Sequence, residues 1–192
     1  MSADAGELNS PQYDKSKLKS VGEDVFISAQ VEIRRSNLVS IGNHVAIDSG
    51  LYLTCQAEIG DYIHIGPGVI IIGGPKGLLQ MGHFTNIALG SKILCASDEF
   101  LGDSLITTPG IPLEYTKVII KPVIFERFAN VCANVVILPG VTLGEGSVVG
   151  ACSLVTKDTE PWTIYVGIPA RPLKMRQKEK MLEYAKKLGY FN

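Results

Sequence analysis

An apolar residue recurs every six positions along most of this chain, and this period constrains the fold more than any other feature. A glycine often follows directly, where a tight corner tolerates little side chain. The strands of a β-sandwich would instead alternate with period two and turn at longer spacing. The period therefore predicts an all-β solenoid wound from six-residue repeats. Its apolar positions are Val21, Ile27, Ile33, Ile41, Ile47, Leu53, Ile59, Ile65, Ile71, Met81, Ile87, Ile93, Ile119, Phe125, Val131, Ile137, Leu143, Val149 and Val155.

Irregularities of the repeat fall at one place. If three repeats make one triangular coil, the shifts from 33 to 41, from 71 to 81 and from 93 to 119 all lie at the same corner, and positions 119, 125 and 131 open the next coil. Repeat proteins build binding faces by confining insertions to one edge. The longest insertion, residues 99–118, exceeds a passive turn. We therefore expect the functional site at this edge.

The overall composition suits one domain without a strong electrostatic field. The chain has 192 residues, 46% of them hydrophobic, and a formal net charge of -1. Nothing in this balance attracts nucleic acid or an anionic membrane. The polar N-terminus lacks the apolar stretch of a signal peptide, and no segment has the length of a membrane span. We expect a cytoplasmic protein with a polar segment at 1–20, a solenoid at 21–160 and a tail at 161–192.

The tail carries a helix signal. The segment LKMRQKEKMLEYAKKLG has helix-forming composition, with Pro172 near its start and Gly189 at its end. It predicts a short α-helix that covers the open end of the solenoid. Its basic residues are either a solvated face or a surface for phosphate.

Two stretches carry a family resemblance. ILPGVTLGEGSVVGACSLVTKD, followed by VGIPARPLKMR, resembles the hexapeptide-repeat acyltransferases, most closely their sugar O-acetyltransferase branch. The resemblance covers the repeats and the tail, but neither residues 1–20 nor the loop 99–118. It implies a left-handed parallel β-helix, an exception to the usual right-handed crossover. It also implies a homotrimer with active sites between subunits, and acetyl-CoA or a related acyl-CoA along the C-terminal coils.

The resemblance also implies which residues hold the acyl-CoA. Small side chains would admit the pantetheine arm close to the backbone, and cations would meet its phosphates. The alternative for the Thr-Lys-Asp segment among them is ordinary turn chemistry. The implied positions are Ala133, Ala151, Thr156, Lys157, Arg171 and Lys174.

This chain has a different residue at the position of the family's catalytic base. In the sugar O-acetyltransferases a histidine ends the hexad before the long loop and deprotonates the acceptor hydroxyl. The hexads here run MGHFTN, IALGSK and ILCASD, so that position holds Asp98. Aspartate, with a reference pKa of about 3.9, is a weak base for an alcohol, whereas an amine acceptor needs only to lose its ammonium proton. The family's sugar-binding asparagine and aspartate align near Gly66 and Gly74, which cannot replace them.

These changes predict transfer of an acetyl or similar short acyl group to the amino group of a sugar, carried by a nucleotide as in the related amino-sugar N-acyltransferases. The alternatives are O-acetylation of a hydroxyl and a solenoid scaffold without catalysis. For Asp98 itself the alternative is a turn residue bonded to its own backbone. Residues near the expected edge form the candidate acceptor site: His83, Asn86, Glu99, Glu114, Tyr115 and Lys117. His83 is also a candidate base, because imidazole titrates near neutral pH.

A metal site is not expected. Zinc carbonic anhydrases share this fold, but they need three convergent histidines, and His44, His64 and His83 belong to different coils. The four cysteines are too scattered for a zinc knuckle or a redox pair, and we expect buried free thiols at Cys55, Cys95, Cys132 and Cys152.

Overall fold

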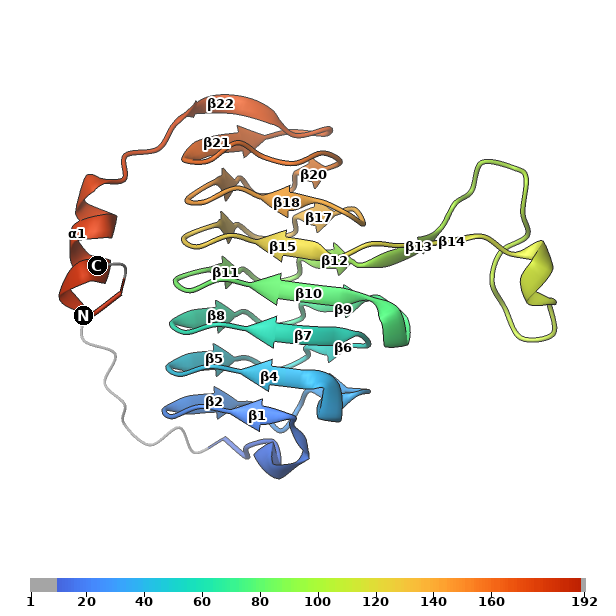
Figure 1. The fold of residues 1–192 in the computed structure, drawn as a ribbon, viewed down its shortest axis with the longest axis horizontal. Coiled ribbons are helices and arrows are strands. Elements are labelled where there is room, and N and C mark those ends of the chain that lie inside the picture. The colour runs from blue at the N-terminus through green and yellow to red at the C-terminus, as the bar shows by residue number, and fades with distance from the viewer. Residues whose placement is uncertain (1–9, 191–192) are drawn as a thin grey trace.

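The computed structural model describes residues 10–190 and is a left-handed parallel β-solenoid with three faces (Figure 1). This confirms the predicted fold class. The first face consists of β1 (Ser20–Val21), β4 (Val39–Ile41), β7 (Gln56–Ile59), β10 (Leu78–Met81), β15 (Val123–Phe125) and β18 (Thr142–Leu143). The second consists of β2 (Val25–Ile27), β5 (Val45–Ile47), β8 (Ile63–Ile65), β11 (Asn86–Ile87), β16 (Asn130–Val131), β19 (Val148–Val149), β21 (Thr163–Val166) and β22 (Arg171–Met175). The third consists of β3 (Glu32–Ile33), β6 (Tyr52–Leu53), β9 (Ile70–Ile72), β12 (Lys92–Leu94), β17 (Val136–Ile137) and β20 (Leu154–Val155).

The core is a set of columns, one for each face. On the second face, Ile27, Ile47, Ile65 and Ile87 lie in register on adjacent parallel strands, and each is at most 1% exposed. Neighbouring strands are about 4.8 Å apart, so equal side chains stack in direct contact. Full burial of one such side chain stabilises the fold by about 1.5–3 kcal/mol. The six-residue period is therefore the spacing that returns an apolar side chain to the interior at every face.

Strand register corrects one predicted coil. Met81 of β10 is paired directly with Phe125 of β15, so the positions 125, 131 and 137 form one coil and 143, 149 and 155 the next. Ile119 is not a core position; it is 36% exposed and lies in β14 (Val118–Ile120), which pairs antiparallel with β13 (Ala96–Asp98). Its spacing of six from Phe125 fits the period by coincidence. The three insertions still share the corner between the third and first faces, here called the third corner.

Four short 3-10 helices lie outside the faces: η1 (Lys15–Lys17), η2 (Ser36–Leu38), η3 (Gly74–Lys76) and η4 (Leu113–Tyr115). η2 and η3 fill the two shorter insertions at the third corner. The longest insertion leaves the stack as the β13–β14 hairpin and projects far from it, with η4 in its outer part (Figure 1). We call residues 96–120 the excursion.

The corner between the first and second faces, the first corner, carries a column of rings. His44, Tyr62, Phe84 and Phe128 each occupy the left-handed backbone region, with φ between 56° and 62°, which aims their side chains outward. Successive ring centroids are 4.5, 5.0 and 5.2 Å apart, and Trp162 extends the column at 5.8 Å from Phe128. Offset stacking at this spacing is favourable. We call these five rings the aromatic column.

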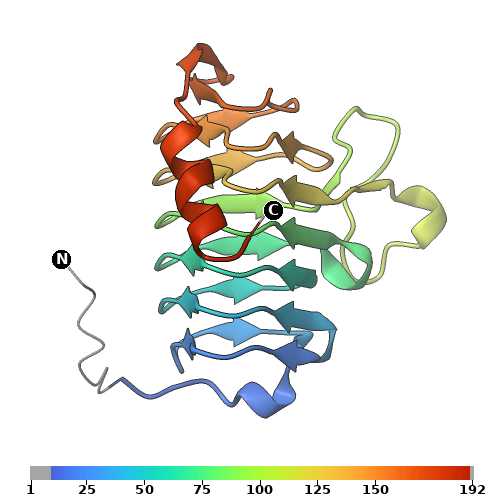
Figure 2. The ribbon, with the colours of Figure 1, turned by 60° about the vertical axis from the view of Figure 1, so that its left-hand side comes forward.

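The C-terminal helix α1 (Glu179–Lys187) lies along the first corner and does not cover the open end of the solenoid, so that prediction is wrong (Figure 2). Ala185 is buried against the aromatic column, with Met181 and Leu182 beside it. This apolar stripe at helical spacing has its partner in the column, which explains the docking site. The helix also starts later than predicted, because residues 171–175 form β22, antiparallel to β21. Gly189, at φ 85°, follows its end in a glycine cap.

The division at residues 20 and 160 stays a prediction, although β21 and β22 continue the second face beyond it. Residues 1–9 and 191–192, which belong to the predicted polar segment and tail, lie outside the described residues. Within residues 10–190, none of the helices has the length and apolar character needed to cross a membrane.

Candidate active site

Asp98 ends β13, where the chain leaves the stack at the third corner. Its Oδ1 atom accepts two hydrogen bonds from Thr107, one from the backbone N–H at 3.0 Å and one from the hydroxyl at 2.8 Å. The side chain is half-buried. Asp98 is therefore held by a residue farther along the excursion, and not by its own neighbouring backbone as in a simple turn.

Glu99 and Lys117 face each other across the base of the excursion. Their backbones are joined by a hydrogen bond from the Glu99 N–H to the Lys117 carbonyl, and Lys117 Nζ lies 2.6 Å from Glu99 Oε2. The same Nζ lies 3.4 Å from Asp103 Oδ2. The hydrogen bond with Glu99 raises the pKa of Lys117, and the charge of Lys117 lowers the pKa of Asp103. These predicted acceptor residues therefore fasten the excursion to itself.

The outer part of the excursion is unusually apolar for an exposed segment. Phe100, Leu101 and Leu113 are 71%, 79% and 80% exposed. Exposed apolar clusters of this kind mark surfaces that another molecule covers. Glu114 and Tyr115, both predicted to contact the acceptor, lie in η4. Within residues 10–190, the hydrogen bonds on the Asp98 carboxylate come from Thr107 and from neither of these two residues.

His83 and Asn86 lie elsewhere on the chain. His83 is at the first corner. Its Nδ1 atom accepts a hydrogen bond from the Asp61 backbone N–H at 3.0 Å, and its ring centroid lies 5.1 Å from that of Tyr190. Asn86 is on the second face, next to Asn130 of the following coil, and its amide lies 3.4 Å from the Val131 carbonyl. A single chain does not bring either residue to Asp98, which is at the third corner.

The predicted donor residues form two groups. Thr156, Lys157 and Arg171 line one pocket of about 350 Å³ at the C-terminal end of the stack, where two cations meet. Lys174 is in β22 opposite Ile164 and does not line this pocket. The other group, Ala133 and Ala151, lies in adjacent coils at the second corner, between the second and third faces. Their coils are joined by a hydrogen bond from the Cys152 N–H to the Ala133 carbonyl at 2.9 Å.

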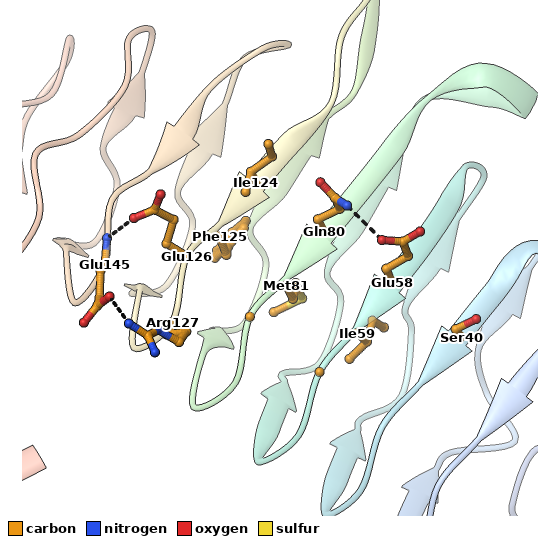
Figure 3. A pocket seen from close by; sticks show the side chains of 12 residues that line it. Ser40, Glu58, Ile59, Gln80, Met81, Ile124, Phe125, Glu126, Arg127 and Glu145 are labelled. Atoms are coloured by element: carbon orange, nitrogen blue, oxygen red, sulfur yellow. Dashed lines mark hydrogen bonds and ion pairs between the residues drawn. The ribbon is translucent and has the colours of Figure 1, made fainter. Parts of the chain in front are cut away.

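A larger groove of about 630 Å³ runs over the outside of the first face (Figure 3). Two pairs of its polar side chains are engaged with one another: Gln80 donates to Glu58 at 2.8 Å, and Arg127 pairs with Glu145 at 2.6 Å. Apolar side chains also line the groove. None of the predicted site residues lines it, so we do not place the candidate site there.

Residues 10–190 contain no group of three His, Cys, Asp or Glu side chains that could hold a metal ion. The four cysteines are free, with Cys55 and Cys95 buried and Cys132 half-buried, whereas Cys152 is exposed, so its predicted burial is wrong. Cys152 occupies a second-corner turn with φ 58°, which points its side chain outward.

Thr107 was not predicted from the sequence. It lies nine positions after Asp98 in a Thr-Thr-Pro segment typical of turns, and its contact depends on how the excursion folds back. A pattern search offers no signal for such a contact, because the excursion has no repeat. Asp61 and Tyr190, which tie the C-terminal segment to the first corner by a 2.8 Å hydrogen bond, were also missed, because they lie 129 positions apart in the sequence.

Comparisons of sequence and of structure both find known proteins similar to this chain, although no family model matches it. It is 35% identical to the dTDP-4-amino-4,6-dideoxy-D-glucose acyltransferase of Escherichia coli, over 92% of this chain and 91% of that protein. A variant of AntD, an N-acyltransferase from Bacillus cereus, in complex with dTDP-4-amino-4,6-dideoxyglucose and coenzyme A, superposes with a TM-score of 0.87 at 33% identity, covering 95% of this chain and 99% of that one. A shorter match, 31% identical over 62% of this chain and 63% of the relative, is to the galactoside O-acetyltransferase of E. coli strain K12.

The first two matches span nearly the whole chain, 92% and 95% of it. The fold, the altered residue at the end of the hexad and the relatives agree on one class. The chain belongs to the left-handed β-helix acyltransferases, in the branch of CoA-dependent enzymes that acylate nucleotide-linked amino sugars.

Proposed function

We propose that this protein transfers a short acyl group from its CoA thioester to the amino group of a dTDP-linked amino-dideoxy sugar. The observation that carries the proposal is Asp98 at the position of the expected histidine, held by Thr107 at the mouth of the excursion. The near full-length relative and the structural neighbour, whose names include this substrate class, support it.

In this reaction the neutral amine attacks the thioester carbonyl, a C–N bond forms, and the C–S bond breaks to release the CoA thiol. The nitrogen loses two protons: one from the ammonium before attack, and one as the amide forms. We assign the first to Asp98, which attracts the ammonium, accepts this proton and passes it to solvent; the second goes to the leaving thiolate, which becomes the CoA thiol. A carboxylate suffices because the neutral amine is already nucleophilic.

The acyl donor is proposed to lie along the C-terminal coils. Lys157 and Arg171 meet at the pocket that also contains Thr156, and they suit the phosphates of CoA. Ala133 and Ala151 leave room for the pantetheine arm at the second corner. Lys174, in the neighbouring strand β22, remains a proposed phosphate contact.

We further propose a homotrimer with its active sites between subunits. Asp98 at the third corner and the alanines at the second corner are separated by the width of the third face in one chain. A neighbour whose second corner faces the excursion would bring the two groups together. Its surface would also cover the exposed Phe100, Leu101 and Leu113. In such an assembly Glu99, Glu114, Tyr115, Lys117, His83 and Asn86 stay candidates for contacts with the sugar nucleotide.

The test is an acceptor panel with acetyl-CoA in which release of free thiol is followed. We expect turnover with dTDP-4-amino-4,6-dideoxyglucose, and little with the matching dTDP-6-deoxyglucose or with a galactoside. Asp98→Asn should lower kcat by about 100-fold or more, the usual scale for loss of a general base. Asp24→Asn is the matched control, since Asp24 pairs with His44 at the first corner.

Turnover confined to hydroxyl acceptors would establish the O-acetyltransferase alternative instead. Absence of binding to CoA or its thioesters would favour a scaffold. Because acyl-CoA and nucleotide sugars are made in the cytoplasm, the proposal also places the protein there.

A further inference from the structure

We infer that Thr107 is a positioning residue that sets the orientation of the Asp98 carboxylate toward the acceptor amine. The inference rests on the proposed function. It starts from the geometry at Asp98: among residues 10–190, the hydrogen bonds found on this carboxylate both come from Thr107 and both end on Oδ1. Two donors from one residue fix the plane of the carboxylate and leave Oδ2 to face the substrate.

The backbone around Thr107 makes this contact specific. β13 and β14 pair with Asp98 opposite Val118, which fixes where the excursion begins and ends. Farther out, the Leu105 N–H donates to the Tyr115 carbonyl at 2.7 Å, so the segment that carries Thr107 is tied to the returning segment. Lys117 forms ion pairs with Glu99 and Asp103, and these pairs join the returning part of the excursion to its outgoing part. Thr107 is thus delivered to Asp98 by a folded segment and not by a free loop.

The chemistry requires such an orientation. A free Asp side chain rotates about its terminal bond, and a general base must lie within about 2.6–3.2 Å of the proton that it takes. Each of the two hydrogen bonds from Thr107 opposes this rotation. The hydroxyl of Thr107 supplies one of these bonds and the backbone N–H supplies the other, so a side-chain substitution removes only the first.

The test uses variants that separate orientation from folding. Thr107→Val keeps the shape and the backbone donor but removes the hydroxyl, and Thr107→Ser restores it. We expect Thr107→Val to lower kcat for the amino-sugar acceptor about tenfold, the effect of about 1.4 kcal/mol, with the KM for acetyl-CoA unchanged. Thr107→Ser should recover most of the rate. Thr108→Val is the matched control on the adjacent residue and should act like the wild-type protein.

The decisive readout is a double-mutant cycle. In the Asp98→Asn background, Thr107→Val should cause no further loss, because its effect passes through the carboxylate. Independent, multiplicative losses from the two substitutions would overturn the inference, as would full activity of Thr107→Val. If Thr107→Val lowers the melting temperature, the cycle still decides, since a structural defect would reduce the rate in both backgrounds. A wild-type protein that acylates no amino acceptor would refute the proposed function together with this role, whereas an active wild type with an unaffected Thr107→Val refutes the role alone.

Discussion

Phe84 is at the middle of the aromatic column, and its removal tests how α1 is held to the solenoid. Its ring stacks on Tyr62 at 5.0 Å and on Phe128 at 5.2 Å, and Tyr190 meets it edge-on at 5.1 Å. An aromatic pair contributes about 0.5–1.5 kcal/mol beyond its buried area. Phe84→Ala, which loses three of them, should therefore lower the free energy of unfolding by about 2–4 kcal/mol. Phe84→Leu keeps apolar contact and should cost about half as much.

Backbone strain contributes equally to the free energies of unfolding of Phe84→Ala and Phe84→Leu. Phe84 has φ 60°, and Ala and Leu meet the same left-handed backbone cost as Phe. The loss in Phe84→Leu therefore reports the ring contacts, and the further loss in Phe84→Ala reports the apolar contact.

The assay is urea unfolding followed by the fluorescence of Trp162, the single tryptophan, which lies in the same column. With a typical slope of about 2 kcal/mol per M, the midpoint of Phe84→Ala should fall by about 1–2 M. Tyr184→Ala is the control, since this aromatic side chain is on the exposed side of α1 and should cost less than about 1 kcal/mol. An unchanged midpoint for Phe84→Ala, or a wild-type midpoint for Phe84→Leu, would refute a stabilising role of the stacked rings.

Two further outcomes are expected. Gly73 has φ −170°, which any residue adopts, but an added Cβ would lie 2.8 Å from the Cβ atoms of both Cys55 and Cys95. Gly73→Ala should therefore lower the free energy of unfolding by about 1–3 kcal/mol through overpacking. A urea midpoint equal to that of the wild type would contradict this. The hydrogen bond to Asp61 raises the pKa of Tyr190 to about 12, above its ordinary value near 10. Its stabilisation is therefore complete below pH 10 and is lost as the pH rises through 12. Wild-type stability should fall more steeply than that of Tyr190→Phe over this range, and parallel pH profiles would exclude the contribution.

The carboxyl of Asp61, which accepts the Tyr190 hydrogen bond, affects stability at acid pH. Burial by itself would raise the pKa of the Asp61 carboxyl, but the Asn43 N–H, the Tyr190 hydroxyl and His83 outweigh it, so the pKa lies below its ordinary value. This contribution is present above about pH 4 and is lost as the pH falls through the lowered pKa. Asp61 thus holds the C-terminal segment across the neutral range.

The sequence predicted the repeat well because each hexad carries its own signal. Ile47, Ile65 and Ile87 are core residues for a local reason: six residues cross one face and turn one corner. The same local rule produced the error at Ile119, since a β-hairpin also contains apolar residues at regular spacing. Pairing between β13 and β14 is a long-range contact that a period cannot reveal.

The helix was placed wrongly because its docking site was overlooked. The rings at 44, 62, 84 and 128 each follow a core position of the first face by three residues, so the aromatic column was present in the sequence as a repeat. What the period does not show is that the left-handed backbone at these positions turns the rings outward. An outward apolar column needs a cover, and α1 supplies it.

The candidate site was predictable in part. Asp98 was found because a family position had changed, and Thr156, Lys157 and Arg171 because their motif is specific; the last three do share a pocket. The contact between Asp98 and Thr107 depends on an irregular segment whose folding no periodic pattern encodes. In the proposed trimer, the joining of donor and acceptor groups would depend on a second chain, which a single sequence describes only through resemblance.

The position of the new acyl group tests the central claim most directly. dTDP-4-amino-4,6-dideoxyglucose has both an amino group and free hydroxyls, so one substrate offers both reactions to the enzyme. After incubation with acetyl-CoA, NMR of the purified product distinguishes an amide at the amino-bearing carbon from an ester at a hydroxyl. We predict the amide alone, stable to mild base. An ester that mild base removes, with the amine unmodified, would contradict the assignment of Asp98 to an amine acceptor.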